Sequence, residues 1–252
     1  MNSLSPLAGI RVLDLSRVMA GPLCAMALAD LGADVIKVEH PDRGDDTRDW
    51  GLRIGQNNTS YFNSCNRNKR SICLDLQDPA GQALARDLAA RSDIVIQNFK
   101  FGGAARMGLG YEALSRDNPK LIYCSISGYS VLGDERGRPG YDLVVQGESG
   151  LMATNGEEGQ GPLKFGVAAV DMFTGMYAAQ AILAVLHERG RTGRGRHVQM
   201  SLYDSGMMVG SYYGLTAWVN KQDPAKFGNS HPSIVPYGVF DAADGPVVIA
   251  VG

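Results

Sequence analysis

Residues 10–39 read IRVLDLSRVMAGPLCAMALADLGADVIKVE, and this stretch decides the fold. The runs IRVLDL and ADVIKVE at its two ends are short and apolar, which predicts buried β-strands. Between them, residues 20–31 predict a helix with Pro22 in its favoured first turn and Gly32 at its end. A strand, a helix and a second strand in so short a span predict a parallel crossover unit.

The same alternation of strands and helices continues along the chain. Further strands are predicted at residues 71–76, 93–97 and 120–127, and further helices at 78–90, with Asp78 as its cap, at 111–118 and at 201–219. Alternating elements of this kind predict an α/β fold, with a Rossmann-like open sheet that carries helices on both faces.

The end of the chain departs from this pattern. Residues 235–251 predict a hairpin around the turn AADG. We therefore expect a domain boundary near residue 222, with a large domain over residues 1–222 and the beginning of a small domain over residues 223–252. Because the chain ends on a predicted strand, we expect it to be the N-terminal portion of a longer protein and to be poorly active by itself.

The composition excludes several classes of function. The formal net charge of -2 shows no basic surplus of the kind that nucleic acid attracts, so no nucleic-acid partner is expected. The histidines and cysteines have no metal-ligand spacing, so no metal site is expected. There is no C-x-x-C pair, and residues 1–6 carry no basic segment leading into an apolar one, which indicates free thiols in a cytoplasmic enzyme.

Residues 167–186 are long and apolar enough to cross a bilayer. They include Asp171, Thr174 and Gln180, and a charged residue inside a membrane span is costly. We therefore interpret this stretch as a buried helix and expect no membrane partner.

The usual ligand motifs of such sheets are missing. No G-x-G-x-x-G follows a predicted strand and no Walker A motif is present, so nicotinamide and nucleotide chemistry lose their sequence support. The stretch SRVMAGP at residues 16–22 nevertheless leads from the first strand into a helix, and helix N-termini attract phosphate through free N–H groups. Arg17 favours an anionic ligand there, whereas Gly21 and Pro22 fit a plain turn equally well.

Asp171 is the candidate nucleophile. The stretch GVAAVDMFTGM at residues 166–176 places one carboxylate in an apolar segment at the predicted start of a long helix. A helix N-terminus stabilises the ionised form that a nucleophile needs, and apolar surroundings shield a reactive acyl intermediate from water. A plain N-cap aspartate fits the same stretch, so both interpretations stay open at this point.

A series of ordered motifs resembles the class III CoA transferases, the family of formyl-CoA transferase and the CaiB–BaiF type. The resemblance covers essentially the whole chain and is strongest to members that take CoA from succinyl-CoA to dicarboxylates. The motifs are PLAGIRVLD at 6–14, AGP at 20–22, LGADVIKVE at 31–39, GDDTR at 44–48, NRNKRS at 66–71, QNF at 97–99, RMG at 106–108, GYD at 140–142, Asp171, and RTGRG at 191–195.

The resemblance implies transfer of CoA from an acyl-CoA thioester to a carboxylic acid, with CoA as a substrate rather than a bound cofactor. Asp171 matches the family's covalent nucleophile, which forms an aspartyl anhydride and then an aspartyl-CoA thioester. His40 stands where formyl-CoA transferase has an arginine, so the chain departs from that enzyme there. The positions that match CoA contacts are Arg17, Val18, Ala20, His40, Leu74, Asn98, Phe99 and Arg106.

The predicted substrate pocket is made of Met19, Arg48, Tyr141 and His231. The stretch HPSIVPY at residues 231–237 resembles the corresponding segment of succinyl-CoA-dependent members, so succinyl-CoA is the expected donor and a small dicarboxylate the expected acceptor. His231 could donate a hydrogen bond to a distal carboxylate, and Arg48 or Arg67 could supply positive charge. A plain loop at the entry to the small domain explains the same stretch equally well.

Two alternatives remain open. An α-methylacyl-CoA racemase shares the fold and the CoA site, but it needs a histidine base where this chain has Tyr141, and tyrosine is a poor base at neutral pH. A non-catalytic CoA-binding module is the other alternative, and the presence of Asp171 argues against it. Full-length members of the family form homodimers of two interlocked chains, which the resemblance implies here.

Overall fold

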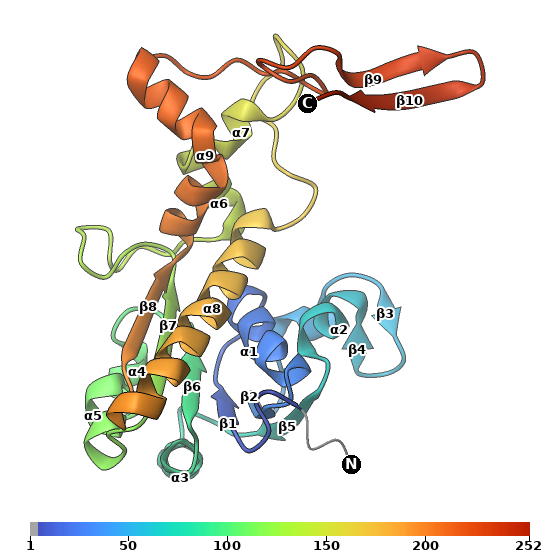
Figure 1. The fold of residues 1–252 in the computed structure, drawn as a ribbon. Coiled ribbons are helices and arrows are strands. Elements are labelled where there is room, and N and C mark those ends of the chain that lie inside the picture. The colour runs from blue at the N-terminus through green and yellow to red at the C-terminus, as the bar shows by residue number, and fades with distance from the viewer. Residues whose placement is uncertain (1–4) are drawn as a thin grey trace.

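The computed structural model describes residues 5–252, and its centre is a six-stranded sheet in the order β5-β2-β1-β6-β7-β8 (Figure 1). Every neighbouring pair in this sheet is parallel. Two antiparallel pairs, β3 with β4 and β9 with β10, lie outside it. The predicted α/β fold with a Rossmann-like open sheet is therefore confirmed.

The elements have the following bounds. The strands of the large sheet are β1 (Arg11–Asp14), β2 (Asp34–Glu39), β5 (Lys69–Cys73), β6 (Ile94–Gln97), β7 (Ile122–Ser127) and β8 (His197–Ser201), and the other strands are β3 (Arg53–Ile54), β4 (Asn58–Thr59), β9 (Tyr237–Ala242) and β10 (Gly245–Ala250). The helices are α1 (Ala20–Asp30), α2 (Ser60–Asn66), α3 (Pro79–Ala90), α4 (Gly103–Arg106), α5 (Tyr111–Asp117), α6 (Asp142–Glu148), α7 (Leu151–Thr154), α8 (Ala169–Thr192) and α9 (Leu202–Asn220), with a short 3-10 helix η1 (Asp46–Asp49).

Side chains of the central strands alternate between two apolar cores, one on each face of the sheet. Val12 and Ile94 belong to the core that α1 and α8 cover, whereas Leu13 and Val95 belong to the core beneath α3 and α5. Burial on both faces explains why these short strands are apolar along most of their length. The loops that follow the strands are thus carried on a core that is packed from both sides.

Most predicted elements of the sheet are confirmed, including the helix that Asp78 caps, where its carboxylate accepts from Ala80 N at 2.6 Å. The strand predicted at residues 71–76 instead spans β5, because its charged start hides it from an apolar pattern. Lys69 is buried there and its Nζ donates to Asp14 Oδ2 at 2.9 Å, so the charge is paired inside the protein. The sequence pattern does not predict β8, whose pairing partner β7 lies far away in the chain.

The last part of the described chain forms an arm, made of α9 and the hairpin β9–β10, that extends away from the large sheet (Figure 1). The loop before the hairpin is tied to residues 155–161 by Lys226, whose Nζ donates to the carbonyl oxygens of Asn155 and Gly161 at 2.6 Å each. The predicted hairpin is confirmed here, and the predicted helix is present but kinked at Ser211, whose φ of 45° is not helical. The domain boundary near residue 222 stays a prediction.

The long helix α8 contacts α1 most closely at Gly175. A Cβ added to Gly175 would lie 2.6 Å from the Ala20 carbonyl oxygen and 3.1 Å from Leu23 Cβ, so only glycine lets the two helices come this close. In residues 5–252, α8 is the one helix long and apolar enough to cross a membrane by length and composition. Its inner face packs into the core on this side of the sheet, whereas Met172, Phe173 and Met176 are exposed, so the helix is partly buried rather than fully buried as predicted.

Replacing Gly175 by alanine should separate α8 from α1 and destabilise the protein by about 1–3 kcal/mol, because the new methyl group meets backbone that cannot yield. Gly190→Ala is the matched control on the same helix, since an added Cβ there has no atom within 4 Å. Alanine at that position should be neutral or stabilise by up to about 1 kcal/mol through helix propensity. Thermal melting of both variants checks this, and equal melting temperatures would contradict the close contact.

Candidate active site

The carboxyl ends of four adjacent strands carry most of the predicted CoA contacts. Arg17 follows β1, His40 follows β2, Leu74 follows β5, and Asn98 and Phe99 follow β6. Because these four strands are neighbours in the sheet and run parallel, their following residues lie along one edge. This is the edge at which open α/β sheets bind their ligands.

The turn after β1 is held by side chains rather than by backbone pairing. Ser16 N donates to Asp14 Oδ1 at 3.0 Å, and the Ser16 carbonyl oxygen accepts from Lys37 Nζ at 2.8 Å. Arg17 N donates to Asn98 Oδ1 at 2.9 Å, and Asn98 Nδ2 donates back to the Arg17 carbonyl oxygen at 2.7 Å. The Asn98 amide therefore pairs with Arg17 as a neighbouring strand would.

Val18 completes the turn in an unusual conformation. Its φ of 72° lies in the left-handed region, which costs a β-branched residue on the order of 1–3 kcal/mol. Val18 N lies 3.3 Å from each carboxylate oxygen of Asp45, and its carbonyl oxygen accepts from Cys65 Sγ at 3.4 Å. Asp45 is in turn paired with Lys37 at 2.8 Å, and both side chains are buried.

Helix α1 begins directly after this turn and has no side-chain cap. Met19 is its N-cap residue and makes no capping hydrogen bond through its side chain. The first N–H groups of α1, starting at Ala20, are therefore left for another acceptor. This open helix start, beside Arg17, matches the expected position for a phosphate or a thioester oxygen.

Asp171 lies in the first turn of α8, as predicted from the sequence. The cap of this helix start comes from α6: Asp142 Oδ1 accepts from Val170 N at 2.9 Å and from Asp171 N at 3.1 Å. Gln146 Nε2 donates to the second oxygen of Asp142 at 2.5 Å and keeps that carboxylate in place. Asp171 itself is thus not the N-cap residue, and its carboxylate is left out of the capping bonds.

The surroundings of Asp171 favour its neutral form. Burial, and then the negative charge of Asp142, raise the pKa of Asp171 to about 7. This corrects the expectation that the helix N-terminus keeps Asp171 ionised. The N–H groups of the first turn point at Asp142 instead, so the loss of water around Asp171 dominates.

The contact between α8 and α1 brings Asp171 to the turn after β1. Asp171 precedes Gly175 by one helical turn, so the two residues share the face of α8 that meets α1. Gly175 touches Ala20, the first residue of α1. The nucleophile candidate and the open helix start therefore belong to one site.

Tyr61 is a member of this site that the sequence did not indicate. Burial, and then the charge of Asp171, raise the pKa of Tyr61 to about 12, so its hydroxyl stays protonated and lies near Asp171. Its ring packs edge-on against Trp50 with the centroids 5.7 Å apart. Asp142 was part of the quoted motif GYD, and its position next to Tyr141 was the one signal for it in the sequence.

Comparison with known proteins gives the family. Residues 7–252 match the family described as CoA-transferase family III. The chain belongs to this family. The predicted resemblance to class III CoA transferases is thereby confirmed.

Several relatives of this CoA-transferase family are similar over the whole chain. The chain is 47% identical to the succinate–glutarate CoA-transferase of Agrobacterium fabrum, over 100% of this chain and 64% of that protein. It is 42% identical to the succinyl-CoA:glutarate CoA-transferase of Homo sapiens, over 100% of this chain and 58% of that protein. The chain thus spans about three-fifths of the length of these curated relatives.

A solved structure has the same fold. A CAIB/BAIF family protein from Brucella suis aligns with a TM-score of 0.92 at 45% identity, over 98% of this chain and 66% of that one. The arrangement of the sheet and of α1 against α8 is thus that of a CoA-transferase family III protein.

Among the predicted CoA contacts, some polar side chains are free in the structure and others are already bonded within the chain. Arg106 is exposed, and its guanidinium has no hydrogen bond or ion pair with any residue of the described chain, so it is free for a phosphate. The Asn98 amide is instead occupied by Arg17 on both polar atoms. His40 Nδ1 accepts from Asp42 N at 3.2 Å, and Leu74 is buried. These CoA contacts stay predictions. Asn98 holds the turn after β1 through its two hydrogen bonds to the Arg17 backbone.

The structure gives Arg48 a role other than substrate binding. Its guanidinium forms a two-bond pair with Glu39, with Nε–Oε2 at 2.6 Å and Nη2–Oε1 at 2.7 Å, and lies 3.7 Å from the centre of the Phe62 ring. Burial raises the pKa of Glu39, but the hydrogen bonds from Arg48 and Ser71 outweigh it and lower the pKa to about 2. The charge of Arg48 is therefore neutralised within the fold.

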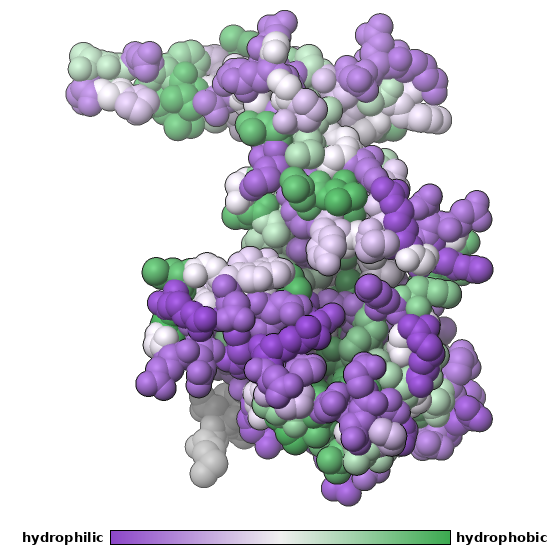
Figure 2. All heavy atoms as spheres, turned by 180° about the vertical axis from the view of Figure 1, so that it is seen from behind, coloured by the Kyte–Doolittle hydropathy of each residue, from purple (hydrophilic) through white to green (hydrophobic). Residues whose placement is uncertain are grey.

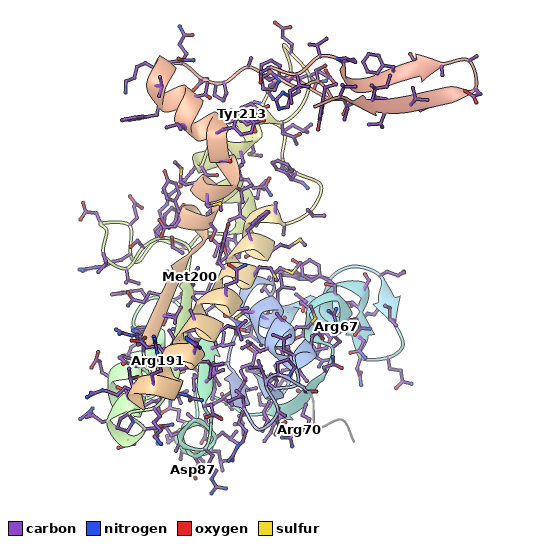
Figure 3. All side chains as sticks on the ribbon, in the orientation of Figure 1. Arg67, Arg70, Asp87, Arg191, Met200 and Tyr213 are labelled. Atoms are coloured by element: carbon purple, nitrogen blue, oxygen red, sulfur yellow. The ribbon has the colours of Figure 1, made fainter. Side chains whose placement is uncertain are left out.

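The other residues predicted to bind the substrate lie in different parts of the structure. Arg67 pairs with Asp30 at the last residue of α1, the opposite end from the open helix start (Figure 3). His231 lies in the arm, where its Nδ1 accepts from Ser233 N at 3.1 Å, and no hydrogen bond or ion pair in residues 5–252 links it to Asp171. Tyr141 is exposed and directly precedes Asp142. Of the predicted pocket, Met19 and Tyr141 thus lie beside the site.

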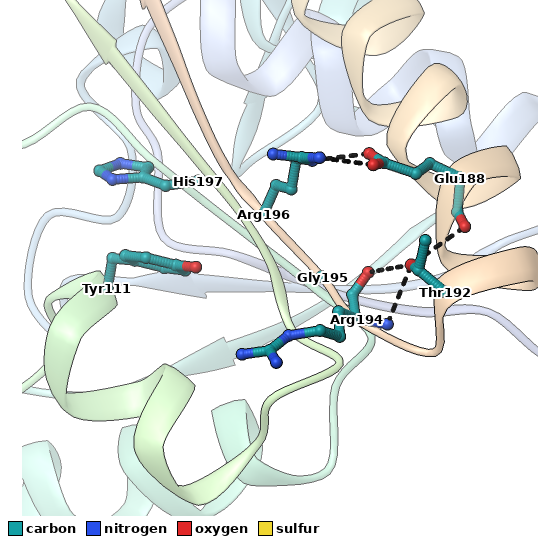
Figure 4. Close-up of a pocket in the computed structure, with 7 residues that line it drawn as sticks. All are labelled: Tyr111, Glu188, Thr192, Arg194, Gly195, Arg196 and His197. Carbon is teal, nitrogen blue, oxygen red and sulfur yellow. Dashed lines mark hydrogen bonds and ion pairs between the residues drawn. The ribbon is translucent and has the colours of Figure 1, made fainter.

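Two cavities of about 330 and 580 Å³ lie at the opposite edge of the sheet. The smaller one is lined by His197, at the amino end of β8, whose ring stacks on Tyr111 with centroids 4.7 Å apart, and by the ion pair of Arg196 with Glu188 (Figure 4). No predicted site residue lines either cavity. In the described part of the chain, no three His, Cys, Asp or Glu side chains are grouped to hold a metal ion.

Asp171→Asn should stabilise the protein at neutral and alkaline pH. Because the pKa of Asp171 is raised from about 3.8 to about 7 on folding, the wild-type protein loses stability as pH rises through this window, whereas asparagine cannot ionise. The gain should be absent below about pH 4 and complete above about pH 8, with a rise in melting temperature of roughly 2–4 °C for each kcal/mol recovered.

The control for this measurement is Asp204→Asn, because Asp204 lies in the first turn of α9 but is exposed to solvent. It should show no comparable rise. A melting temperature of Asp171→Asn that runs parallel to that of the wild type at all pH values would contradict the raised pKa.

Proposed function

We propose that the protein is a CoA transferase that moves CoA from an acyl-CoA thioester to a carboxylic acid, with Asp171 as the covalent nucleophile. The observation that carries the proposal is the position of Asp171: a partly buried carboxylate on the face of α8 that meets the open start of α1. Membership of the CoA-transferase family III supports the reaction. The relatives named above are CoA-transferases by name.

The proposed reaction alternates two kinds of step: a carboxylate attacks a thioester, and CoA thiolate then attacks the resulting anhydride. A carboxylate oxygen of Asp171 attacks the thioester carbonyl carbon, the C–S bond breaks, and CoA thiolate leaves a mixed anhydride behind. The thiolate then attacks the Asp171 carbonyl carbon, which releases the donor acid and forms an aspartyl-CoA thioester. The acceptor carboxylate attacks this thioester, and the released thiolate takes the acceptor acyl group from the resulting anhydride.

The surroundings of Asp171 suit both the attack and the protection of the intermediates. A pKa of about 7 means that a large fraction is ionised at neutral pH, while the carboxylate is more basic than an exposed aspartate. Each step exchanges one activated acyl bond for another, so the free energy of the thioester is retained only if water is excluded. Burial of Asp171 supports this exclusion.

CoA is proposed to bind along the carboxyl edge of the sheet. The open N–H groups at the start of α1 and the guanidinium groups of Arg17 and Arg106 offer positive charge to its phosphates. Arg17 has one half-buried partner, Asp46, at 3.3 Å, which a phosphate can displace. No permanently bound cofactor is part of the proposal.

The proposed donor is succinyl-CoA and the proposed acceptor a small dicarboxylate. The support is the names of the relatives, which include succinate–glutarate, succinyl-CoA:glutarate and succinyl-CoA:mesaconate CoA-transferases. In the described residues Arg48 is paired with buried Glu39, Arg67 is paired with Asp30 at the surface, and His231 lies in the arm, so the proposal assigns the distal carboxylate to none of the three.

The proposed assembly is a homodimer of interlocked chains in the cytoplasm, with no nucleic acid or membrane as partner. The arm exposes many large apolar residues, including Leu215 and Trp218 of α9 and Val248 of the hairpin. Figure 2 shows hydrophobic residues among polar ones along the hairpin, and in water such residues are usually covered by protein, either a partner chain or a further segment. The free cysteines, of which Cys73 is exposed, fit a reducing compartment.

Asp171→Ala should abolish CoA transfer, by several orders of magnitude, and leave CoA binding nearly unchanged, because the side chain forms the covalent intermediates but no contact that CoA needs. Asp49→Ala is the control, since Asp49 is exposed and pairs only with Arg53. Transfer is measured by mass spectrometry of the thioesters. Retained transfer would exclude Asp171 as nucleophile, and α-deuterium incorporation without transfer would favour the racemase.

A panel of acids of increasing length, each offered with succinyl-CoA, tests the substrate class. Succinate, glutarate and related dicarboxylates should accept CoA, whereas monocarboxylates of equal length should react far more slowly, because they lack the second charge. Thioester products are identified by mass. Equal use of monocarboxylates would contradict a site that recognises the distal carboxylate.

A further inference from the structure

Val18 is the most strained residue of the candidate site. Residues 5–252 contain four non-glycine residues with positive φ, at Val18, Asn68, Ser211 and Lys221, and Val18 is the one with a β-branched side chain. Valine rarely adopts this conformation by itself. The conformation must therefore be imposed by its surroundings.

The surroundings that impose it are a buried ion pair. The Asp45 carboxylate receives Val18 N on both oxygens, and it is held by Lys37 Nζ at 2.8 Å and by Thr47, whose N donates at 3.0 Å and whose Oγ1 donates at 2.7 Å. Lys37 also donates to the Ser16 carbonyl oxygen at 2.8 Å. The side chains of Lys37 and Asp45 are 1% and 0% exposed, so neither contacts a ligand directly.

The turn depends on these bonds more than an ordinary loop would. All six backbone N–H and carbonyl groups of residues 16–18 are bonded to side chains, and none of them to backbone. If Val18 relaxed to an extended conformation, the chain direction between Arg17 and Ala20 would change. The open N–H groups of α1 and the Arg17 side chain would then no longer face the same ligand.

We propose that Asp45, held by Lys37, is a positioning residue that keeps Val18 in the left-handed conformation and so aligns Arg17 with the start of α1 for CoA. The inference rests on the proposed function, because CoA is the ligand that this alignment serves. Asp45 acts through the turn and touches neither CoA nor the reacting atoms.

The test is a double-mutant cycle between Asp45→Asn and Val18→Gly, with the dissociation constant of CoA measured by calorimetry on the whole protein. Asp45→Asn should weaken CoA binding about tenfold, since a change of roughly 1.4 kcal/mol corresponds to that factor. Glycine adopts a positive φ without strain, so in the Val18→Gly background the same substitution should weaken binding less than about threefold. The partial rescue by glycine is the signature of positioning, which a loss of general stability would not produce.

Two further variants keep the test decisive. Asp49→Asn makes the same chemical change in the exposed part of η1 and should leave CoA binding as in the wild type. Lys37→Met with Asp45→Leu removes both buried charges and leaves no unpaired ion, so it keeps the fold if Asp45→Asn does not. It should show the same loss of CoA affinity and the same rescue by Val18→Gly.

The outcomes separate this proposal from the proposed function. If the wild-type protein does not bind CoA, the proposed function fails. If the wild type binds CoA but loss of Asp45 leaves the affinity unchanged, or weakens it equally with valine and with glycine at position 18, the positioning role is overturned and the proposed function stands.

Discussion

The close contact of α8 with α1 at Gly175 is the constraint on which the candidate site depends. The two helices belong to distant parts of the chain, and their backbones meet because Gly175 has no side chain. One helical turn earlier, Asp171 is carried to the start of α1 and to the turn after β1. Burial at this position, and then the negative charge of Asp142, raise the pKa of Asp171 to about 7. The packing of α8 against α1 thus sets the place of the proposed nucleophile, and its burial together with Asp142 of α6 sets its protonation.

The opposite wall of the site is polar, and its charges compensate one another. Lys69 pairs with Asp14, Lys37 with Asp45, and Arg48 with Glu39, all at or below the carboxyl edge of the sheet. Buried pairs of this kind add little stability over an apolar core, but they fix geometry once formed. Here Asp14, Lys37 and Asp45 of the first two pairs hold the turn of residues 16–18, which has no backbone partner of its own. The stability of the fold comes from the two apolar cores, whereas the shape of the site comes from these pairs.

The sequence predicted the parts that obey local rules. The β1–α1–β2 unit follows from apolar runs, Pro22 and Gly32, and the position of Asp171 at a helix start follows from the same pattern. The sequence did not predict β8, because this edge strand forms by pairing with β7, which lies far away in the chain. Nor did it predict the raised pKa of Asp171, since the cap that diverts the helix N–H groups comes from Asp142 on another helix. Side chains such as Arg48 were assigned to a substrate because their partner Glu39 can be recognised only in three dimensions.

The most direct measurement of the central claim follows oxygen atoms through the reaction. When an acceptor acid labelled with ¹⁸O in its carboxylate takes CoA from an aspartyl-CoA thioester, the bridging oxygen of the anhydride comes from the acceptor and stays with the aspartate. After turnover and digestion, mass spectrometry should therefore find ¹⁸O in the peptide that contains Asp171 and in the donor acid released in later turnovers. Efficient transfer with no label in that peptide would contradict covalent catalysis by Asp171.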